Sequence, residues 1–153
     1  TIYKAVNDYF ILAVVDAKIT DLGSIITVPK YKITANLSLS VGNGKQMLPL
    51  ADTDLNSDVN NLLSMMKPLM GNMLGQFGKG IEFVCFQGTD YTGKRFVNPR
   101  REGSFTVNYS GRSYKWRLPL GSLLPAKIDK ETQEVFPGNY NYNPYTGNKL
   151  IQK

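Results

Sequence analysis

Basic side chains gather in one segment of this 153-residue chain, between Thr89 and Leu118. The segment holds seven cations against two acidic residues, which gives it a net charge of +5, compared with +6 for the whole chain. Charge concentrated in this way attracts anions. We therefore predict that the seven cations bind an anionic partner: Lys94, Arg95, Arg100, Arg101, Arg112, Lys115 and Arg117.

Three interpretations of this basic segment are open. A nucleic acid would use the cations for its phosphates and aromatic side chains for base stacking. An acidic protein or a glycan would use the cations alone. The third interpretation is a solvated surface without a partner, which is the usual place for charges on loops and hairpins. The aromatic residues available for stacking are Tyr91, Phe96, Tyr109, Tyr114 and Trp116.

The chain contains no histidine, which excludes several kinds of catalysis. Histidine-based triads, Cys–His dyads and His-ligated zinc all need an imidazole. Two carboxylates acting on a glycan stay formally open, and Asp90 with Glu102 is the pair to test. The single Cys85 lies among apolar residues and is predicted to be a buried, unreactive thiol. We expect no enzymatic activity, no cofactor and no metal site.

The last part of the chain, residues 119–153, is rich in Asn, Tyr, Pro and Gly and poor in apolar runs. Asn143-Pro144-Tyr145-Thr146-Gly147 has the shape of a zinc knuckle, C-P-x-C-G, with both cysteines replaced. Ile128 to Thr132 aligns with a first knuckle, and Val135 to Tyr142 with the strand pair between the two. Residues 128–153 thus resemble a zinc ribbon without its ligands, which implies two knuckle-like turns on a small hairpin and no metal. The alternative is an ordinary turn-rich tail.

The clearest structural signal is the strict alternation of apolar and polar residues from Tyr31 to Val41. A period of two is typical of a strand with one buried and one exposed face. We therefore predict one long strand there, with Leu37 deeply buried. Gly42-Asn43-Gly44 predicts a tight turn, and Lys45 to Leu50 the returning strand.

Four other segments are expected to add strands. Tyr9–Asp16 and Ile81–Gln87 are continuous apolar runs, typical of strands buried on both faces. Ser104–Tyr109 and Ser113–Leu118 predict a hairpin, because they alternate and flank a Ser-Gly turn. The alternation directs the aromatic residues of the second hairpin strand inward and leaves its lysine and arginine exposed.

One helix is predicted over residues 54–77, where apolar residues recur at i, i+3 and i+4. Asp52, Thr53 or Asp54 can cap its start. Pro68 inside the pattern predicts a bend or a boundary, with a second short helix after it. We expect the apolar face of this helix to pack on the sheet.

These elements predict an α+β fold: a mostly antiparallel β-sheet or open sandwich with one kinked amphipathic helix packed on it and an irregular C-terminal tail. Residues 1–118 would form the β-rich core, and residues 119–153 an appendage, in one form a metal-free zinc-ribbon-like hairpin. No run of about 18 apolar residues occurs, so we expect no membrane span.

For function, we expect a non-enzymatic binding or assembly module that uses the basic segment and the C-terminal tail. Its partner would be another protein or a second copy of the chain. A nucleic-acid-binding domain is the alternative, and a histidine-free enzyme acting on a glycan is the second alternative.

Overall fold

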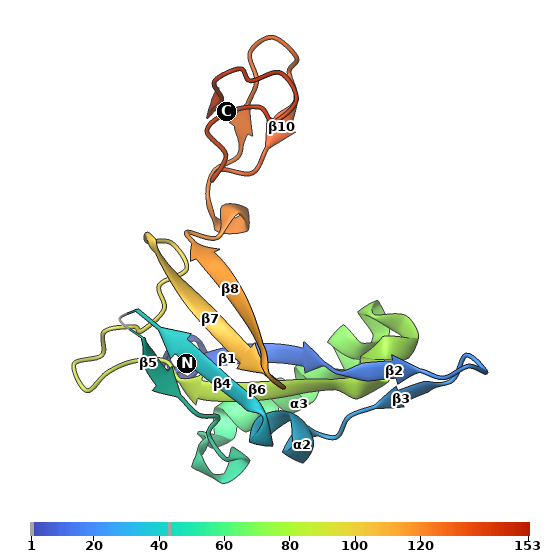
Figure 1. The fold of residues 1–153 in the computed structure, drawn as a ribbon. Helices are drawn as coiled ribbons and strands as arrows, with labels where there is room; N and C mark the ends of the chain where they lie inside the picture. The colour runs from blue at the N-terminus through green and yellow to red at the C-terminus, as the bar shows by residue number, and fades with distance from the viewer. Residues whose placement is uncertain (1, 43) are drawn as a thin grey trace. The chain divides into compact units, whose positions relative to one another are not determined.

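A computed structural model describes residues 2–42 and 44–153, which adopt an α+β fold of antiparallel sheets and short helices (Figure 1). The fold class predicted from the sequence is confirmed. The chain divides into two compact units. Unit 1 comprises Thr1–Phe96 and Thr106–Tyr114, and unit 2 comprises Val97–Phe105 and Lys115–Lys153.

The centre of unit 1 is a two-stranded antiparallel sheet of β1 (Tyr9–Val15) and β6 (Ile81–Gln87). Helix α3 (Ser57–Met73) packs on one face of this pair, together with the short helix α1 (Ile2–Asn7). Apolar side chains fill the space between α3 and the sheet, as the helical periodicity predicts. The buried cluster there consists of Leu55, Val59, Leu63, Phe83 and Cys85.

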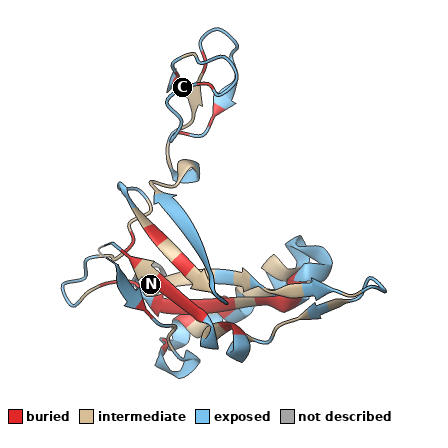
Figure 2. Ribbon diagram, in the orientation of Figure 1, coloured by how far each residue is buried: buried red, intermediate tan, exposed pale blue. Residues whose placement is uncertain are grey.

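β6 is buried along almost its whole length, as Figure 2 shows, and its bounds match the prediction. Phe83 and Cys85 face α3, and the alternate residues Val84 and Phe86, which point to the opposite face, are buried as well. β1 is different, since its side chains are half-buried or exposed. The prediction of two buried faces is therefore wrong for β1, although β1 and β6 each pair with a single strand within the described residues.

The region predicted as one long strand, Tyr31 to Val41, is two elements: helix α2 (Lys30–Ala35) and strand β4 (Leu37–Val41). Pro29 precedes α2 in an extended conformation, and its carbonyl accepts the first two helical hydrogen bonds at 3.0 and 3.2 Å. The prediction is thus wrong for the first half of the segment and right for the second.

Polar residues predicted to line an exposed strand face instead stabilise α2. The Thr34 hydroxyl donates to the carbonyl of Lys30 (3.1 Å), and the Asn36 side-chain amide donates to the carbonyl of Lys32 (2.9 Å). Both bonds satisfy backbone carbonyls within a single short helix. Threonine and asparagine compete well for such local bonds, which the alternation of polarity does not reveal.

The predicted return of the chain after β4 is confirmed, with a shorter strand. β5 (Lys45–Met47) pairs antiparallel with β4. The predicted continuation to Leu50 is wrong, because the backbone amide of Leu50 donates to the carbonyl of Cys85 in β6 (2.8 Å). Asn43 of the predicted turn lies outside the described residues.

β7 (Gly103–Tyr109) and β8 (Arg112–Leu118) form the predicted hairpin and complete a four-stranded sheet in the order β5-β4-β7-β8. Ser110 and Gly111 make the two-residue turn, with φ angles of 47° and 77°. Two positive φ angles define a type I′ turn, whose twist suits a tight hairpin. β8 is consequently an edge strand of the sheet.

The helix predicted over residues 54–77 is shorter than expected, because α3 begins at Ser57 and ends at Met73. Asn56 caps it, with its Oδ1 accepting the backbone amide of Asp58 at 2.8 Å. The prediction of a cap among residues 52–54 is wrong, since these form a separate 3₁₀ turn, η1.

α3 continues through Pro68, so the predicted boundary there is wrong. We still expect a bend at this position, because proline donates no backbone hydrogen bond. The chain leaves the helix at Gly75, whose φ is 60°, and continues as the 3₁₀ helix η2 (Gly75–Gly80). A Cβ on Gly78 would lie 1.7 Å from the carbonyl oxygen of Gly71, so η2 folds back on α3 where glycine alone fits.

A ribbon of two short antiparallel strands extends from the end of β1 (Figure 1). It consists of β2 (Ala17–Ile19) and β3 (Ile25–Thr27), joined by a turn at residues 20–24. We call residues 17–27 the arm. At its base, the backbone amide of Val28 donates to the carbonyl of Asp16 (2.8 Å) and closes the ribbon.

Unit 2 contains the C-terminal tail, which holds a small antiparallel sheet. Its strands are β9 (Lys127–Ile128), β10 (Val135–Phe136) and β11 (Ile151–Gln152), in the order β10-β9-β11. A 3₁₀ turn, η3 (Gly121–Leu123), precedes them. Within the described residues, no helix is long and apolar enough to cross a membrane.

Replacing Leu37 with alanine tests the core position of β4. Leu37 is 3% exposed, so Leu37→Ala leaves a cavity and should lower the free energy of unfolding by about 2–5 kcal/mol. Denaturation in urea followed by circular dichroism measures this loss. Tyr31→Ala is the matched control, because Tyr31 is 69% exposed and its removal should cost under roughly 0.5 kcal/mol. Equal losses in the two variants would contradict the assignment.

Cys85 should be unreactive in the folded protein. Burial raises the pKa of its thiol to about 11, so at pH 8 only on the order of one thiol in a thousand is the reactive thiolate. We expect no labelling by a thiol reagent at pH 8 before unfolding, and complete labelling in denaturant. Rapid labelling of the native protein would show that β6 opens.

Candidate functional site

The seven cations predicted to bind an anion do not all belong to the same unit. Three lie in unit 1 and four in unit 2: Lys94, Arg95 and Arg112, and Arg100, Arg101, Lys115 and Arg117, respectively. Six of them are exposed, and Arg95 is half-buried. The fold therefore fixes two smaller groups of cations, each within its own unit.

Local turns hold the cations that precede β7. The Asp90 carboxylate accepts the backbone amides of Thr92 and Lys94 at 2.8 and 3.0 Å. The Asn98 side-chain oxygen accepts the amide of Arg100 at 3.0 Å. Such side-chain turns fix the backbone while leaving the long cationic side chains in solvent.

β8 carries the last three cations on a strand with little cover on either face. Its first six residues are exposed, and only Leu118 is half-buried. The Trp116 ring stacks on Phe105 of unit 2, with centroids 5.3 Å apart and planes 4° apart. Alternation along the strand places Lys115 and Arg117 on the opposite face, as predicted from the sequence. Trp116 nevertheless stays 41% exposed.

None of these seven cations forms an ion pair within the described part of the chain. Its two ion pairs use other lysines, Lys30 with Asp52 at 2.6 Å and Lys67 with Glu82 at 2.7 Å. The predicted anion-binding residues thus keep their full charge toward solvent. Charges of one sign on one short strand repel one another, and an anionic partner would relieve that repulsion.

Sequence analysis missed a row of polar side chains that crosses the sheet. Gln46 of β5 donates to the Ser38 hydroxyl of β4 (3.0 Å), and Asn108 of β7 donates to the Ser40 hydroxyl (3.0 Å). Ser113 of β8 donates to the side-chain oxygen of Asn108 (2.7 Å). This row links side chains across all four strands. The polar residues at alternate positions of the predicted strands could have indicated it, because such residues share one face of a sheet.

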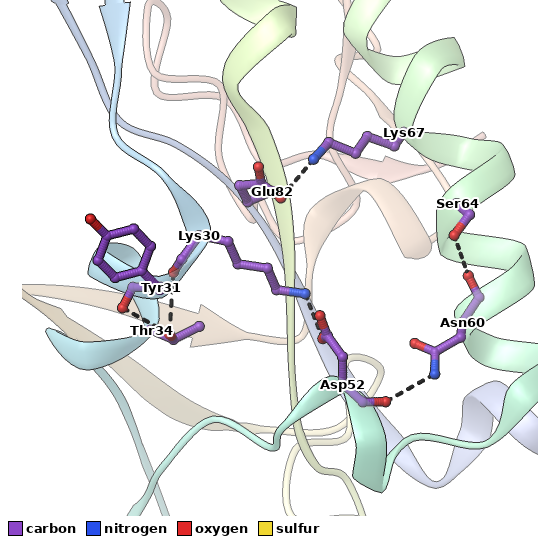
Figure 3. A network of polar contacts seen from close by, with 8 residues as sticks. All are labelled: Lys30, Tyr31, Thr34, Asp52, Asn60, Ser64, Lys67 and Glu82. Atoms are coloured by element: carbon purple, nitrogen blue, oxygen red, sulfur yellow. Dashed lines mark hydrogen bonds and ion pairs between the residues drawn. The ribbon is translucent and has the colours of Figure 1, made fainter.

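A pocket of about 680 Å³ opens in unit 1 between α2 and the segment that follows β5. Figure 3 shows the polar contacts around it: the Lys30 ammonium donates to the Asp52 carboxylate, and the Asn60 side chain donates to the carbonyl of Asp52 at 2.9 Å. Because Lys30 and Asp52 neutralise each other, the rest of the lining decides what the pocket takes. That lining is largely apolar: Tyr31, Ala35, Leu48, Pro49, Leu50 and Ala51, with Thr34.

A smaller pocket of about 290 Å³ lies on the other side of the Lys30–Asp52 pair, next to α3. Lys67 and Glu82 pair across it. The Ser64 hydroxyl also lines it, and this hydroxyl donates to the carbonyl of Asn60 (2.8 Å) (Figure 3). An activated serine donates to a base, and a backbone carbonyl cannot take its proton. The contacts in this pocket thus describe a structural polar network.

Buried polar residues organise the tail. Asp129 and Asn143 are almost fully shielded from solvent. The Asn143 side chain donates to Asp129 Oδ2 (2.7 Å), and the Thr146 hydroxyl donates to the same oxygen (3.1 Å). The backbone amide of Glu131 donates to Oδ1 (2.9 Å). These bonds, the one from Asn143 above all, hold the pKa of the Asp129 carboxyl well below its usual range.

Two turns meet at Asp129 and Asn143, where the alignment with a zinc ribbon places its knuckles. The carbonyl of Asp129 accepts the amide of Gln133 (2.9 Å), and the carbonyl of Asn143 accepts the amide of Gly147 (2.8 Å). Sequence analysis singled out both turns but missed the carboxylate that joins them. Asp129 is one of three acidic residues in this polar stretch, with Glu131 and Glu134, and nothing in the sequence singled it out as the buried one.

The residues at the four knuckle positions do not fit zinc. Asp129, Thr132, Asn143 and Thr146 offer a carboxylate, two hydroxyls and an amide, whereas structural zinc sites use cysteine and histidine. The carboxylate already accepts several hydrogen bonds. Within the described residues, no group of three His, Cys, Asp or Glu side chains could hold a metal ion.

The two carboxylates proposed for glycan chemistry, Asp90 and Glu102, belong to different units. The Thr92 hydroxyl, together with backbone amides, holds the pKa of the Asp90 carboxyl below its usual value. A general acid in a glycosidase needs the reverse, a raised pKa that keeps its proton near neutral pH. Asp90 therefore suits a turn better than proton transfer.

Comparisons with protein-family models, with curated proteins and with solved structures found no match to this chain.

Removing the charge of Asp129 tests its place in the tail. In Asp129→Asn, an amide group would replace an oxygen that accepts from Asn143 or Glu131, so the melting temperature should fall at neutral pH. The folded-state pKa of Asp129 is depressed, so its contribution is present above the unfolded value of about 3.9 and is lost as the pH falls toward the folded value. Calorimetry between pH 2.5 and 7 measures both effects.

The control for this experiment is Asp54→Asn, because Asp54 is an exposed carboxylate. The difference in melting temperature between the wild type and Asp129→Asn should shrink as the pH drops below about 4. The control should follow the wild type at every pH. A constant difference for Asp129→Asn across the whole range would contradict a role for its ionised form.

Proposed function

We propose that this protein is a non-enzymatic binding or assembly module that engages an acidic segment of a protein partner along β8. The observation that carries the proposal is that an edge strand presents Arg112, Lys115 and Arg117 without an ion pair in the described residues. An edge strand has unpaired backbone donors and acceptors on one side. A partner strand can add to that edge, with the main chain supplying affinity and the side chains supplying specificity.

The side chains of β8 select for an acidic partner. Lys115 and Arg117 lie two residues apart on one face of the strand, so acidic residues at alternate positions of a paired strand would lie opposite them. Opposite charges in such cross-strand positions each contribute about 0.2–1 kcal/mol. Arg100 and Arg101, exposed in the same unit, add to the positive potential that attracts the partner.

The geometry favours a protein over a nucleic acid. Binding of a single strand combines a cationic track with aromatic rings on which bases stack. On β8 the aromatic Trp116 and the cations Lys115 and Arg117 point to opposite faces. Phe105 already occupies one side of the Trp116 ring. A nucleic acid following the cations would therefore lack a stacking platform on the same face.

The tail supports the same function with exposed aromatic surface. Tyr142 and Tyr145 are both exposed, although the network around Asp129 orders the turns beside them. Tyrosine is enriched at protein interfaces, because it offers a large contact surface with few rotatable bonds. Tyr142 and Tyr145 are the tail residues that we expect to contact a partner.

Neutralising four cations of unit 2 tests the proposal. The variant Arg100→Gln, Arg101→Gln, Lys115→Gln and Arg117→Gln should lose at least tenfold in affinity for fluorescently labelled poly-glutamate at 50 mM salt. Its melting temperature should stay the same or rise, because like charges are removed. Fluorescence anisotropy measures the affinity, and circular dichroism measures the melting temperature.

A charge-matched control separates position from net charge. The variant Lys4→Gln, Lys18→Gln, Lys32→Gln and Lys79→Gln removes four exposed cations from unit 1, outside β8 and the tail, and should keep most of the affinity. Equal losses in the two variants would show that only net charge matters. Tighter binding of a single-stranded oligonucleotide than of poly-glutamate would favour the nucleic-acid alternative.

A further inference from the structure

The arm presents apolar side chains that nothing in its own unit covers. Leu22, in the turn at its tip, is 96% exposed. Ile19 and Ile26 are also exposed, and the register of β2 with β3 places them on opposite faces of the ribbon. A two-stranded ribbon with apolar residues on both faces is at best marginally stable alone. The arm would therefore gain stability from a surface that takes its tip.

The tip is held in a fixed conformation. The backbone amide of Thr20 donates to the carbonyl of Ser24, and the amide of Gly23 donates to the carbonyl of Thr20, both at 2.8 Å. The amide of Ser24 also donates to the Thr20 hydroxyl at 3.0 Å. Gly23 has a φ of 79°, which a glycine adopts without strain. Leu22 is thus presented by an ordered turn, which lowers the entropy cost of docking it.

The pocket beside α2 has the properties that such a tip needs. Its volume is about 680 Å³, and its lining is largely apolar. Two of the lining side chains, Tyr31 and Leu48, are themselves mostly exposed, by 69% and 71%. Covering them would remove apolar surface from water, which favours association. The polar pair in the wall, Lys30 with Asp52, is already satisfied and needs no ligand charge.

Within one molecule the tip cannot fill this pocket. α2 follows directly after β3 (Figure 1), and α2 lines the pocket, so the pocket lies at the base of the arm. Leu22 lies in the turn between β2 and β3, at the far end of the arm. The strands of the arm separate the two by on the order of 15 Å at roughly 3.3 Å per residue. The ladder between β2 and β3 and the closing bond at Val28 keep the arm extended. The arm tip can therefore reach such a pocket only on another molecule.

We propose that the arm tip of one copy of this chain docks into the pocket beside α2 of a second copy. Leu22 enters the pocket and covers Leu48 and Tyr31. Asp21, next to Leu22, meets Lys32, which lies beside Tyr31 with its ammonium 6.0 Å from the ring centre. The acidic tip and the basic rim are complementary in charge, which fixes the orientation of the contact.

We place this contact head-to-tail: the tip of one molecule meets the pocket of the next, without the two-fold exchange of tips that would stop assembly at a dimer. Each molecule keeps a vacant tip at one end and a vacant pocket at the other. Such heterologous contacts produce a ring where the rotation closes and an open filament where it does not. A tip in a pocket buries less than the roughly 1,600 Å² of a standard stable interface, so we expect association that depends on concentration. The inference is independent of β8 and its proposed acidic partner.

Mixing two blocked variants tests the proposal. Leu22→Asp removes the apolar tip and keeps the pocket, whereas Leu48→Asp places a charge in the pocket and keeps the tip. Each variant alone should be a monomer in sedimentation velocity at millimolar concentration. An equimolar mixture should form a dimer and nothing larger, while the wild type should form larger species. An isologous interface cannot give this pattern.

Controls keep the outcome decisive. Met73→Asp changes another exposed apolar residue, on α3, and should assemble like the wild type. The variant with four glutamines at Arg100, Arg101, Lys115 and Arg117 should also assemble, which separates this proposal from the function proposed for β8. Leu22 and Leu48 are exposed, so neither aspartate should unfold the chain, and circular dichroism verifies this.

Cross-linking locates the contact. A mixture of Leu22→Cys and Leu48→Cys should give one disulfide-linked dimer under mild oxidation, because the buried Cys85 does not compete. Each cysteine variant alone should give much less. A monomeric wild type at all concentrations, no dimer in the mixture of blocked variants, or equal loss in Met73→Asp would overturn the proposal. If the wild type is monomeric at all concentrations, a small apolar molecule becomes the better occupant for the pocket.

Discussion

Unit 1 depends on the burial of both faces of β6. Phe83 and Cys85 on one face require the apolar stripe of α3, and Val84 and Phe86 on the other face require a second layer. A single strand with two apolar faces forces the chain to place elements on both sides of it. The ion pair between Lys67 and Glu82 and the bond from the amide of Leu50 to Cys85 then attach α3 and the end of the β4–β5 hairpin to this one strand.

Sequence patterns predicted an element correctly where its local sequence preference and its packing in the fold favour the same secondary structure. β6 is a seven-residue strand that is mostly apolar, and the β7–β8 hairpin combines alternation with a turn that needs positive φ. The prediction of a strand failed for Tyr31 to Ala35, because alternation over a few residues also fits a short helix that buries only Ile33. Pro29 opens that helix, and its carbonyl accepts from the amides of Lys32 and Ile33, which the alternation of polarity does not reveal. The arm tip and the pocket beside α2 escaped prediction because exposure is a tertiary property.

The tail folds around a buried charge together with two buried apolar side chains, Phe136 and Leu150. A buried carboxylate is costly unless its lone pairs are used, and Asp129 accepts from Asn143, Thr146 and backbone amides. A prediction from composition treats asparagine and threonine as exposed polar residues. It therefore assigns such a segment no ordered core and predicts an irregular tail. Turns do occur at Asp129 and Asn143, where the resemblance to zinc knuckles placed them, and the side chains of both residues accept backbone amides there.

Charge on β8 and apolar surface on the arm divide recognition between two places. An edge strand with unpaired backbone groups tends to pair with the same strand of another copy. Pairing two copies of β8 would bring two cationic strands together, and like charges that lie opposite each other weaken a ladder. The same cations strengthen pairing with an acidic strand. Self-association through the arm tip and the pocket beside α2, as proposed above, would avoid this repulsion.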